Sequence, residues 1–335
     1  MKLLFIGGTG TISTACSQRA LDQGYELWHL NRGQRPSELE GVQKITCNIR
    51  DPESVQASTL GDHTWDVVAQ FIAFTPGEIE RDLELFRGKC GQYVFISSAS
   101  AYAKPMTHPV VTESTALRNP YWQYSRNKIA CEERLQRAHR EEAFPMTIVR
   151  PSFTYDAFVP LAVGASHRLT VIERLRAGKP VVVHGDGTSL WVMTHSEDFA
   201  RGFVPLLGHA SALGEAFHIV SDEVLTWNQI CQTVARAVGA PEPNIIHIPS
   251  DWLAAYDSDR FEGTLLGDKA ESVLFDLSKL RRLVPDYWPQ VPFHVGVRRA
   301  YAKMQAGGAT SDPEEDTYFD TLIETYLKGF PAAPR

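Results

Sequence analysis

Tyr124 and Lys128, four residues apart, have the residue types and the spacing that acid–base chemistry requires. On a helix, residues with this spacing lie on one face, one turn apart. A phenol has an ordinary pKa of about 10, and a neighbouring ammonium favours its ionised form. We therefore expect Lys128 to lower the pKa of Tyr124, Tyr124 to exchange a proton with a substrate oxygen, and Ser98 to hold that oxygen. A surface tyrosine and lysine without chemistry are the alternative, because many helices carry this spacing by chance.

A glycine-rich segment near the N-terminus, GGTGTIS from Gly7 to Ser13, follows a predicted strand and opens a predicted helix. Gly7 suits a tight turn, and Gly10 lets the backbone approach a pyrophosphate. The free N–H groups at Thr11 and Ile12 would then face the phosphates. This context predicts a dinucleotide site, although Ser13 stands where a third glycine is usual. A plain strand–helix turn is the alternative that we disfavour.

The end of the second predicted strand bears on the choice of cofactor. NAD sites commonly carry an acidic residue there, whereas this sequence has Asn31 and Arg32. The guanidinium of Arg32 suits the extra phosphate of NADP, while the amide of Asn31 still suits NAD. The sequence therefore predicts NAD or NADP and slightly favours NADP. After the third strand, we expect Asn48 to bond the adenine and Ile49 to pack against it.

The pattern of short apolar runs and helical segments predicts how these residues are positioned. The expected strands are 2–6, 25–30, 44–47, 67–74, 93–97 and 146–149. The expected helices are 11–23, 124–140, 226–238 and 316–327. Strands that alternate with helices predict an α/β fold, namely a Rossmann-type doubly wound parallel sheet with a smaller C-terminal α/β substrate domain. We expect residues 1–155 to bind the dinucleotide, 156–335 mainly to bind substrate, and part of 190–222 to return to the sheet.

Composition narrows the class of protein. The chain has 335 residues, 33 basic and 40 acidic, and a net charge of -7, so a nucleic-acid partner is disfavoured. Its five cysteines include no CxxC pair, which favours a reducing compartment. The first apolar run, 3–6, is too short for a signal peptide, and no stretch approaches a membrane span. We expect a cytoplasmic protein that does not enter membranes.

Several stretches resemble the extended short-chain dehydrogenase/reductases, the NAD-dependent epimerase/dehydratase family. They are FIGGTGTIS, FISSASAYA, YSRNK, TIVRPSFTY and GDGTSLWVMTHSED. The resemblance implies that the catalytic serine is the one four residues before Tyr102, which is Ser98, and that Lys128 also bonds the nicotinamide ribose. It places Pro151, after Arg150, beside the nicotinamide. The remaining cofactor contacts that it implies are Phe71, Ile72 and Ala73.

The chain also departs from that family. Trp191 stands where nucleotide-sugar enzymes usually carry an arginine for the substrate's diphosphate. Ala99 and Ser100 replace the Asp-Glu pair of the dehydratases, which disfavours elimination. Other stretches look like an atypical bacterial branch related to chloroplast stem-loop RNA-binding proteins. Asp198 is expected to cap a helix, and His195 and Trp227 are expected to be structural.

These observations favour an NAD(P)-dependent oxidoreductase or epimerase that acts on a hydroxyl or carbonyl of a sugar or nucleotide-sugar-like small molecule. One alternative is an NADP-dependent reductase of small carbonyl compounds, which the tryptophan at position 191 suggests. Another is an RNA-associated or regulatory protein that retains the fold. The resemblance further implies a homodimer formed through the helix that carries Tyr124 and Lys128. No metal site is expected.

Overall fold

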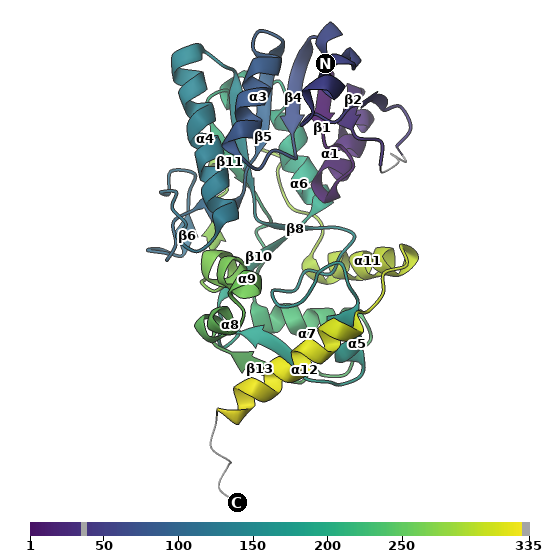
Figure 1. Cartoon of the computed structure of the whole chain (residues 1–335), viewed down its shortest axis with the longest axis vertical. Helices are drawn as coiled ribbons and strands as arrows, with labels where there is room; N and C mark the ends of the chain where they lie inside the picture. The colour runs from purple at the N-terminus through teal and green to yellow at the C-terminus, as the bar shows by residue number, and fades with distance from the viewer. Residues whose placement is uncertain (35–38, 330–335) are drawn as a thin grey trace, which may run out of the picture.

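The structure is a computed structural model that describes residues 1–34 and 39–329. Figure 1 shows two parts stacked along the long axis: a sheet flanked by helices, which holds the N-terminus, and a second group of small sheets and helices, which ends in α12. We call the second group the cap.

The main sheet has seven parallel strands in the order β11-β7-β5-β4-β1-β2-β3. In chain order they are β1 (Lys2–Ile6), β2 (Glu26–Asn31), β3 (Gln43–Thr46), β4 (Trp65–Gln70), β5 (Cys90–Ile96), β7 (Met146–Pro151) and β11 (Ala216–Ile219). The central strands are apolar on both faces, as strands covered on both sides must be. The predicted Rossmann-type α/β fold is confirmed.

Helices cover both faces of this sheet. On one face α1 and α6 pack against each other, and α3 and α4 pack on the other. The helices of this part are α1 (Thr11–Asp22), α2 (Pro52–Gln56), α3 (Pro76–Phe86), α4 (Gln123–Glu142), α6 (Ser196–Phe203) and α10 (Ser278–Leu283). Four short 3₁₀ turns are η1 (Thr59–Asp62), η2 (Ala99–Ala101), η3 (Val204–Leu206) and η4 (Ala210–Ala212). Crossovers of this kind bring the carboxyl ends of the strands to one edge, where a site can form.

The cap contains small sheets and most of the C-terminal helices. Its strands are β8 (Phe153–Tyr155), β9 (Val181–His184), β10 (Leu190–His195), β12 (Val224–Thr226) and β13 (Ile245–Ile248). A separate two-stranded sheet is formed by β6 (Val110–Val111) and β14 (Leu274–Phe275). Its helices are α5 (Thr170–Arg176), α7 (Trp227–Ala237), α8 (Ser250–Tyr256), α9 (Ser258–Phe261), α11 (Phe293–Ala306), α12 (Pro313–Lys328) and a π-helical segment, η5 (Glu262–Lys269).

The segment 190–222 is shared between the two parts. Its first strand, β10, lies in the cap, α6 packs against α1, and β11 pairs with β7 at the end of the main sheet. The division into residues 1–155 and 156–335 stays a prediction, and 330–335 lie outside the described residues. Within the described residues, no helix is both long and apolar enough to span a bilayer.

Candidate active site

The first turn of the sheet is shaped by Gly7, whose φ is +83°. Non-glycine residues rarely adopt this conformation. A Cβ at Gly7 would also overlap the side chain of Ile72, which follows β4. Glycine is therefore required here both for the turn and for the approach of the neighbouring strand's loop.

Ser13 takes the place of the third glycine and stabilises the loop. Its hydroxyl donates to the carbonyl of Gly7 at 2.7 Å and accepts from the N–H of Gly10 at 2.8 Å. Helix α1 then starts at Thr11, so the N–H groups of Thr11 and Ile12 belong to the first turn and have no partner within the helix. The serine that departs from the glycine motif thus joins the two ends of the loop to the start of α1.

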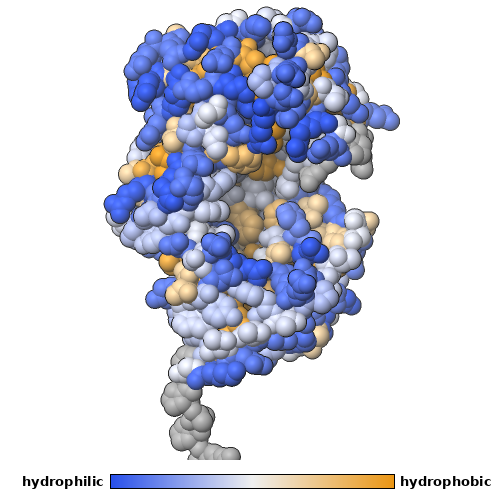
Figure 2. Space-filling view, in the orientation of Figure 1, coloured by the Kyte–Doolittle hydropathy of each residue, from blue (hydrophilic) through white to orange (hydrophobic). Residues whose placement is uncertain are grey.

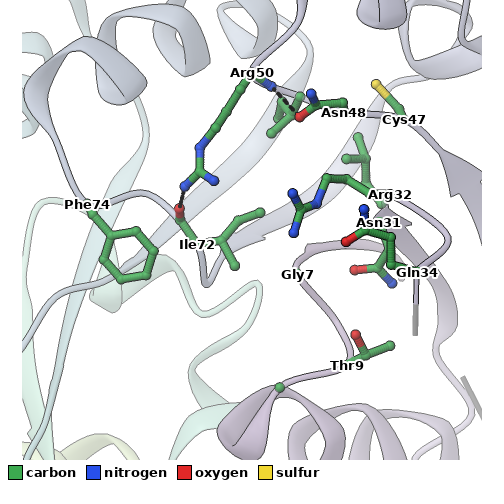
Figure 3. A pocket seen from close by; sticks show the side chains of 13 residues that line it. Gly7, Thr9, Asn31, Arg32, Gln34, Cys47, Asn48, Arg50, Ile72 and Phe74 are labelled. Carbon is green, nitrogen blue, oxygen red and sulfur yellow. Dashed lines mark hydrogen bonds between the residues drawn. The ribbon is translucent and has the colours of Figure 1, made fainter. Parts of the chain in front are cut away.

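A pocket of about 350 Å³ lies beyond this loop, and Figure 3 shows it from close by. Seven of the predicted cofactor contacts line it: Gly7, Gly10, Asn31, Arg32, Asn48, Ile49 and Ile72. Six further residues line the pocket and were not predicted from the sequence: Thr9, Leu30, Gln34, Cys47, Arg50 and Phe74. Most of these residues are next to a predicted contact in the sequence. Their position at the ends of the strands could therefore have predicted them.

Two arginines reach this pocket, and their surroundings differ. Arg50 donates from Nε to Glu78 at 2.5 Å and from Nη2 to the carbonyl of Ile72 at 3.1 Å. Among the described residues, the guanidinium of Arg32 has no hydrogen bond or ion pair, and Figure 3 shows it reaching into the pocket. Arg32 also lines an adjoining hollow with Gln34. Of these two arginines, Arg32 is thus the one whose guanidinium is unpaired within the part of the chain that the structure describes.

Ile72 is fixed through both of its peptide groups. Its N–H donates to Oε1 of Gln70 at 2.9 Å, and its carbonyl accepts from Arg50. Gln70 in turn donates to the buried carboxyl of Asp82 on α3 at 2.6 Å. Gln70 therefore positions Ile72, the residue that packs on the glycine turn.

Five predicted cofactor contacts are not among the residues that line the pocket: Thr11 and Ile12, which were expected to contribute N–H groups, and Phe71, Ala73 and Pro151. The ring of Phe71 packs against Phe5 and Phe203, with centroids 5.3 and 5.7 Å apart, on the opposite face of the sheet. Ala73 is fully buried, and Pro151 lies buried in β7. Successive side chains in an extended segment point to opposite faces of the sheet. Because Ile72 faces the pocket, the side chain of its neighbour Phe71 points away from it.

Ser98, Tyr124 and Lys128 come together at the carboxyl ends of β4 and β5. Nζ of Lys128 donates to the carbonyls of Ala73 and Ile96, both at 2.7 Å, and this lysine is 1% exposed. The ring of Tyr124 lies 6.3 Å from that of Phe74, the residue at the rim of the cofactor pocket. The group therefore lies at the edge of the predicted dinucleotide site.

The serines of this strand end differ in their contacts. Ser98 Oγ lies 2.9 Å from Ser100 Oγ. Burial raises the pKa of Tyr124, and a hydrogen bond from Ser98 partly offsets that rise. Ser100 also accepts from Ser125 on α4 at 2.7 Å. The hydroxyl of Ser97 is buried and unpartnered among the described residues. Of these serines, Ser98 is the one that acts on the tyrosine.

Burial has the largest effect on the ionisation of Tyr124 and Lys128. Burial, with a smaller contribution from Asp268, raises the pKa of Tyr124 to about 12 and outweighs the hydrogen bond of Ser98. Burial also lowers the pKa of Lys128 to about 8. Desolvation therefore dominates both groups in the protein without cofactor, and the expected lowering of the tyrosine pKa stays a prediction for the cofactor-bound protein.

Arg150, which precedes Pro151, is structural. It forms two hydrogen bonds with Glu132 on α4, at 3.0 and 2.6 Å, and both side chains are almost fully buried. A further nitrogen donates to the hydroxyl of Tyr102 at 3.2 Å. This arginine joins β7 to the helix that carries Tyr124 rather than lining the pocket.

The remaining residues singled out in the cap are also structural. Trp191 is 2% exposed and packs on Trp227, with ring centroids 5.5 Å apart, so it cannot stack on a ligand. The prediction that Asp198 caps a helix is wrong, since its carboxylate accepts from the N–H groups of Gln290 and Val291. His195 caps α6 instead, by accepting from the N–H of Glu197.

These features fit a nicotinamide dinucleotide. The glycine turn permits close approach, the first turn of α1 offers N–H donors, and Arg32 supplies an unpaired cation. Figure 2 shows the surface hollowed between the sheet and the cap, with hydrophobic residues in the hollow. Among the described residues, no group of three or more His, Cys, Asp or Glu side chains is arranged to hold a metal ion.

Comparison with known structures shows the same fold. An epimerase from Methanothermobacter thermautotrophicus aligns with a TM-score of 0.74 and 19% identity, covering 92% of this chain and 95% of that one. UDP-glucuronic acid 4-epimerase from Bacillus cereus, in complex with UDP-glucuronic acid and NAD, aligns with a TM-score of 0.71 and 20% identity, covering 91% and 99%.

Comparison of sequences adds relatives and a family. The chain is 26% identical over 290 residues to 2'-dehydrokanamycin reductase of Streptomyces kanamyceticus, covering 86% of this chain and 80% of that protein. It is 27% identical over 260 residues to the chloroplast stem-loop binding protein of 41 kDa b of Arabidopsis thaliana, covering 73% and 65%. The profile of the NAD dependent epimerase/dehydratase family matches residues 3–219. Because this match spans most of the chain, the protein belongs to the NAD-dependent epimerase/dehydratase family and is a nicotinamide-dependent enzyme.

Proposed function

We propose that this enzyme oxidises or reduces a hydroxyl or carbonyl of a sugar or nucleotide-sugar-like substrate by hydride transfer, with Tyr124 as the acid/base. The observation that carries the proposal is the convergence of Ser98, Tyr124 and Lys128 at the rim of the pocket beyond the glycine turn. A nicotinamide bound there supplies the hydride acceptor or donor.

The protein's own groups handle the proton and the geometry. In oxidation, Tyr124 as phenolate accepts the proton of the substrate hydroxyl, and in reduction its phenol donates a proton to the new alkoxide. Ser98 donates a hydrogen bond to the same oxygen and orients it. Lys128, held by two carbonyls, keeps an N–H available for a cofactor ribose and adds positive charge near the phenolate. Because the phenol titrates near 12 on its own, the positive ring of an oxidised cofactor is the further charge that would ionise it.

We further propose a preference for NADP over NAD. Its support is the unpaired guanidinium of Arg32, next to Asn31 and Gln34 at the edge of the pocket. A guanidinium pairs with a phosphate through parallel hydrogen bonds. Asn48 and Ile49 lie farther along the same wall, where the adenine would be bound.

Reduction of a small carbonyl compound unrelated to sugars is the second candidate. The buried Trp191 favours it, because no guanidinium stands where a diphosphate is usually held. The name of a further relative, 2-alkyl-3-oxoalkanoate reductase of Stenotrophomonas maltophilia, which is 24% identical over 266 residues, also favours this candidate. The name 2'-dehydrokanamycin reductase favours reduction of a keto sugar instead. An RNA-binding role is the candidate that the name of the Arabidopsis relative suggests. The net charge of -7 counts against it.

The test is consumption of NADPH and NADH by the purified protein with a panel of keto sugars, nucleotide sugars and small ketones. The proposal expects turnover with a keto sugar and a higher kcat/KM with NADPH. Turnover confined to small ketones would favour the second candidate. Absence of turnover on the whole panel, together with salt-dependent RNA binding at physiological ionic strength, would overturn both.

We also propose a homodimer that pairs through α3 and α4. The outward surface of these helices carries ion pairs, such as Arg134 with Glu80 and Glu142 and Arg87 with Glu142. A contact made through this surface would be polar, so it should weaken as salt screens the charges. Light scattering at low and high ionic strength tests this, and a monomer at both would contradict it.

A further inference from the structure

A second hollow, of about 260 Å³, lies in the cap and is separate from the cofactor pocket. Its walls come from β8, from the loop before α5, from the segment 260–269 and from the start of α12. Phe153 supplies an aromatic surface, and Lys269 and Glu315 supply polar groups. None of these residues has a part in the site described above.

Glu315 is the unusual member of this hollow. Its side chain is buried, with 6% of the residue exposed, and one carboxyl oxygen accepts from the N–H of Ala165 at 2.9 Å. The other oxygen is buried and has no hydrogen-bond partner among the described residues. An unsatisfied buried carboxyl oxygen costs free energy, so a ligand that donates a hydrogen bond to it would gain affinity.

Two cations also line the hollow, and their contacts differ. Nζ of Lys269 lies 3.0 Å from the carboxylate of Asp268, and Arg260 stacks over the ring of Tyr318 at 4.2 Å. The acceptor left over is therefore the oxygen of Glu315. A diphosphate would bring negative charge beside this carboxyl, whereas a hydroxyl or an ammonium would donate to it.

A chain of contacts connects the hollow to the catalytic tyrosine. Nζ of Lys269 lies 5.9 Å from the ring of Trp122, and this ring lies 4.8 Å from that of Tyr124. Lys269 also lies 5.1 Å from the ring of Phe153, inside the hollow. Asp268, next in the chain, is close enough to raise the pKa of Tyr124. The hollow therefore lies next to the residues that pack on Tyr124.

We propose that this hollow is a substrate subsite, in which Glu315 accepts a hydrogen bond from a hydroxyl or amino group of a sugar-like substrate that carries no diphosphate. The proposal rests on the proposed function, since it concerns the part of the substrate remote from the reacting carbon. Phe153 packs on the apolar face of a sugar ring there.

The experiment measures binding of glucose, glucosamine and UDP-glucose to the NADP⁺-loaded protein by titration calorimetry, together with turnover of a small ketone. Glu315→Gln keeps an acceptor for Ala165 and changes the second oxygen into a donor. Glu314→Gln, at the exposed neighbouring position, is the matched control. Thr264→Phe narrows the hollow and leaves the carboxyl of Glu315 unchanged. This variant tests the same subsite if Glu315→Gln does not fold.

In the wild-type protein we expect glucose or glucosamine to bind more tightly than UDP-glucose. We expect Glu315→Gln and Thr264→Phe to weaken that binding roughly ten- to hundredfold, and Glu314→Gln to leave it unchanged. Loss of affinity for glucosamine alone would identify an ammonium as the donor, and loss for both sugars would identify a hydroxyl. The proposal is overturned if both substitutions leave sugar binding unchanged or if UDP-glucose binds most tightly. Turnover of the ketone separates these results from a failure of the hydride-transfer chemistry itself.

Discussion

The ammonium of Lys128 lies 5.8 Å from the centre of the Tyr124 ring and is held there by the carbonyls of Ala73 and Ile96. In this position the ammonium is almost fully buried, and burial dominates the ionisation of both residues. Near pH 7 and without cofactor, the phenol of Tyr124 is therefore neutral, whereas Lys128 is still mostly charged.

The first prediction concerns the ionisation of Tyr124. Burial raises its pKa to about 12, so without cofactor the phenol should stay neutral until the pH approaches that value. Oxidised cofactor should lower the pKa by roughly one unit or more, because a positive ring favours the phenolate. The phenolate absorbance of the wild-type protein minus that of Tyr124→Phe measures this. An identical titration with and without cofactor would contradict the proposed activation.

A second prediction concerns Arg32. Replacing it with Ser removes the free guanidinium of the pocket, so KM for NADPH should rise roughly ten- to hundredfold while KM for NADH changes little. Steady-state kinetics with both cofactors measures this. Arg140→Ser, at the exposed end of α4, is the control. Equal effects on both cofactors would assign Arg32 a role other than phosphate recognition.

The glycine turn gives a third prediction with a matched control. Gly7 and Gly24 both have positive φ, but only a Cβ at Gly7 would meet Ile72, whereas Gly24 faces open space. Gly24→Ala should lower the free energy of unfolding by about 1–2 kcal/mol and spare cofactor binding. Gly7→Ala should lower it further and weaken cofactor binding. Denaturant unfolding and cofactor titration measure the two effects, and adding Ile72→Ala should restore part of the loss.

The buried pair of Glu132 and Arg150 gives a fourth prediction. Glu132→Ala leaves the guanidinium of Arg150 buried without its carboxylate, so the free energy of unfolding should fall by about 3–5 kcal/mol. Glu133→Ala changes the exposed neighbour on the same helix and should cost less than about 0.5 kcal/mol. Urea unfolding measures both, and equal costs would show that the pair adds nothing to stability.

The sequence predicted the parallel sheet well because its strands are apolar and alternate with helices. The predicted strand 2–6 matches β1, and 124–140 lies within α4. The fourth strand ends at Gln70 rather than Phe74, because the chain turns there to place Ile72 on Gly7. The cap was mostly missed: its strands have two to six residues, and its π-helical segment has no periodicity that predicts it.

The sequence predicted the residues of the site that directly follow a strand. It did not predict the properties that depend on contacts between distant parts of the chain. Arg32 and Asn48 follow β2 and β3, so register alone predicted them. Whether Arg32 or Arg50 is free depends on Glu78, which belongs to another element. Likewise, whether the pKa of Tyr124 is raised or lowered depends on burial, and the spacing between Tyr124 and Lys128 does not reveal burial.

The central claim is tested most directly by following the hydride with NADPH that carries deuterium at the transferable position. With a carbonyl substrate that the enzyme turns over, the wild-type protein should place deuterium on the carbinol carbon of the product, as seen by mass spectrometry. Tyr124→Phe should slow this transfer roughly 10²- to 10⁴-fold while still binding NADPH, and Tyr301→Phe, on the remote helix α11, should not. Full transfer by Tyr124→Phe, or a product without deuterium, would contradict the account.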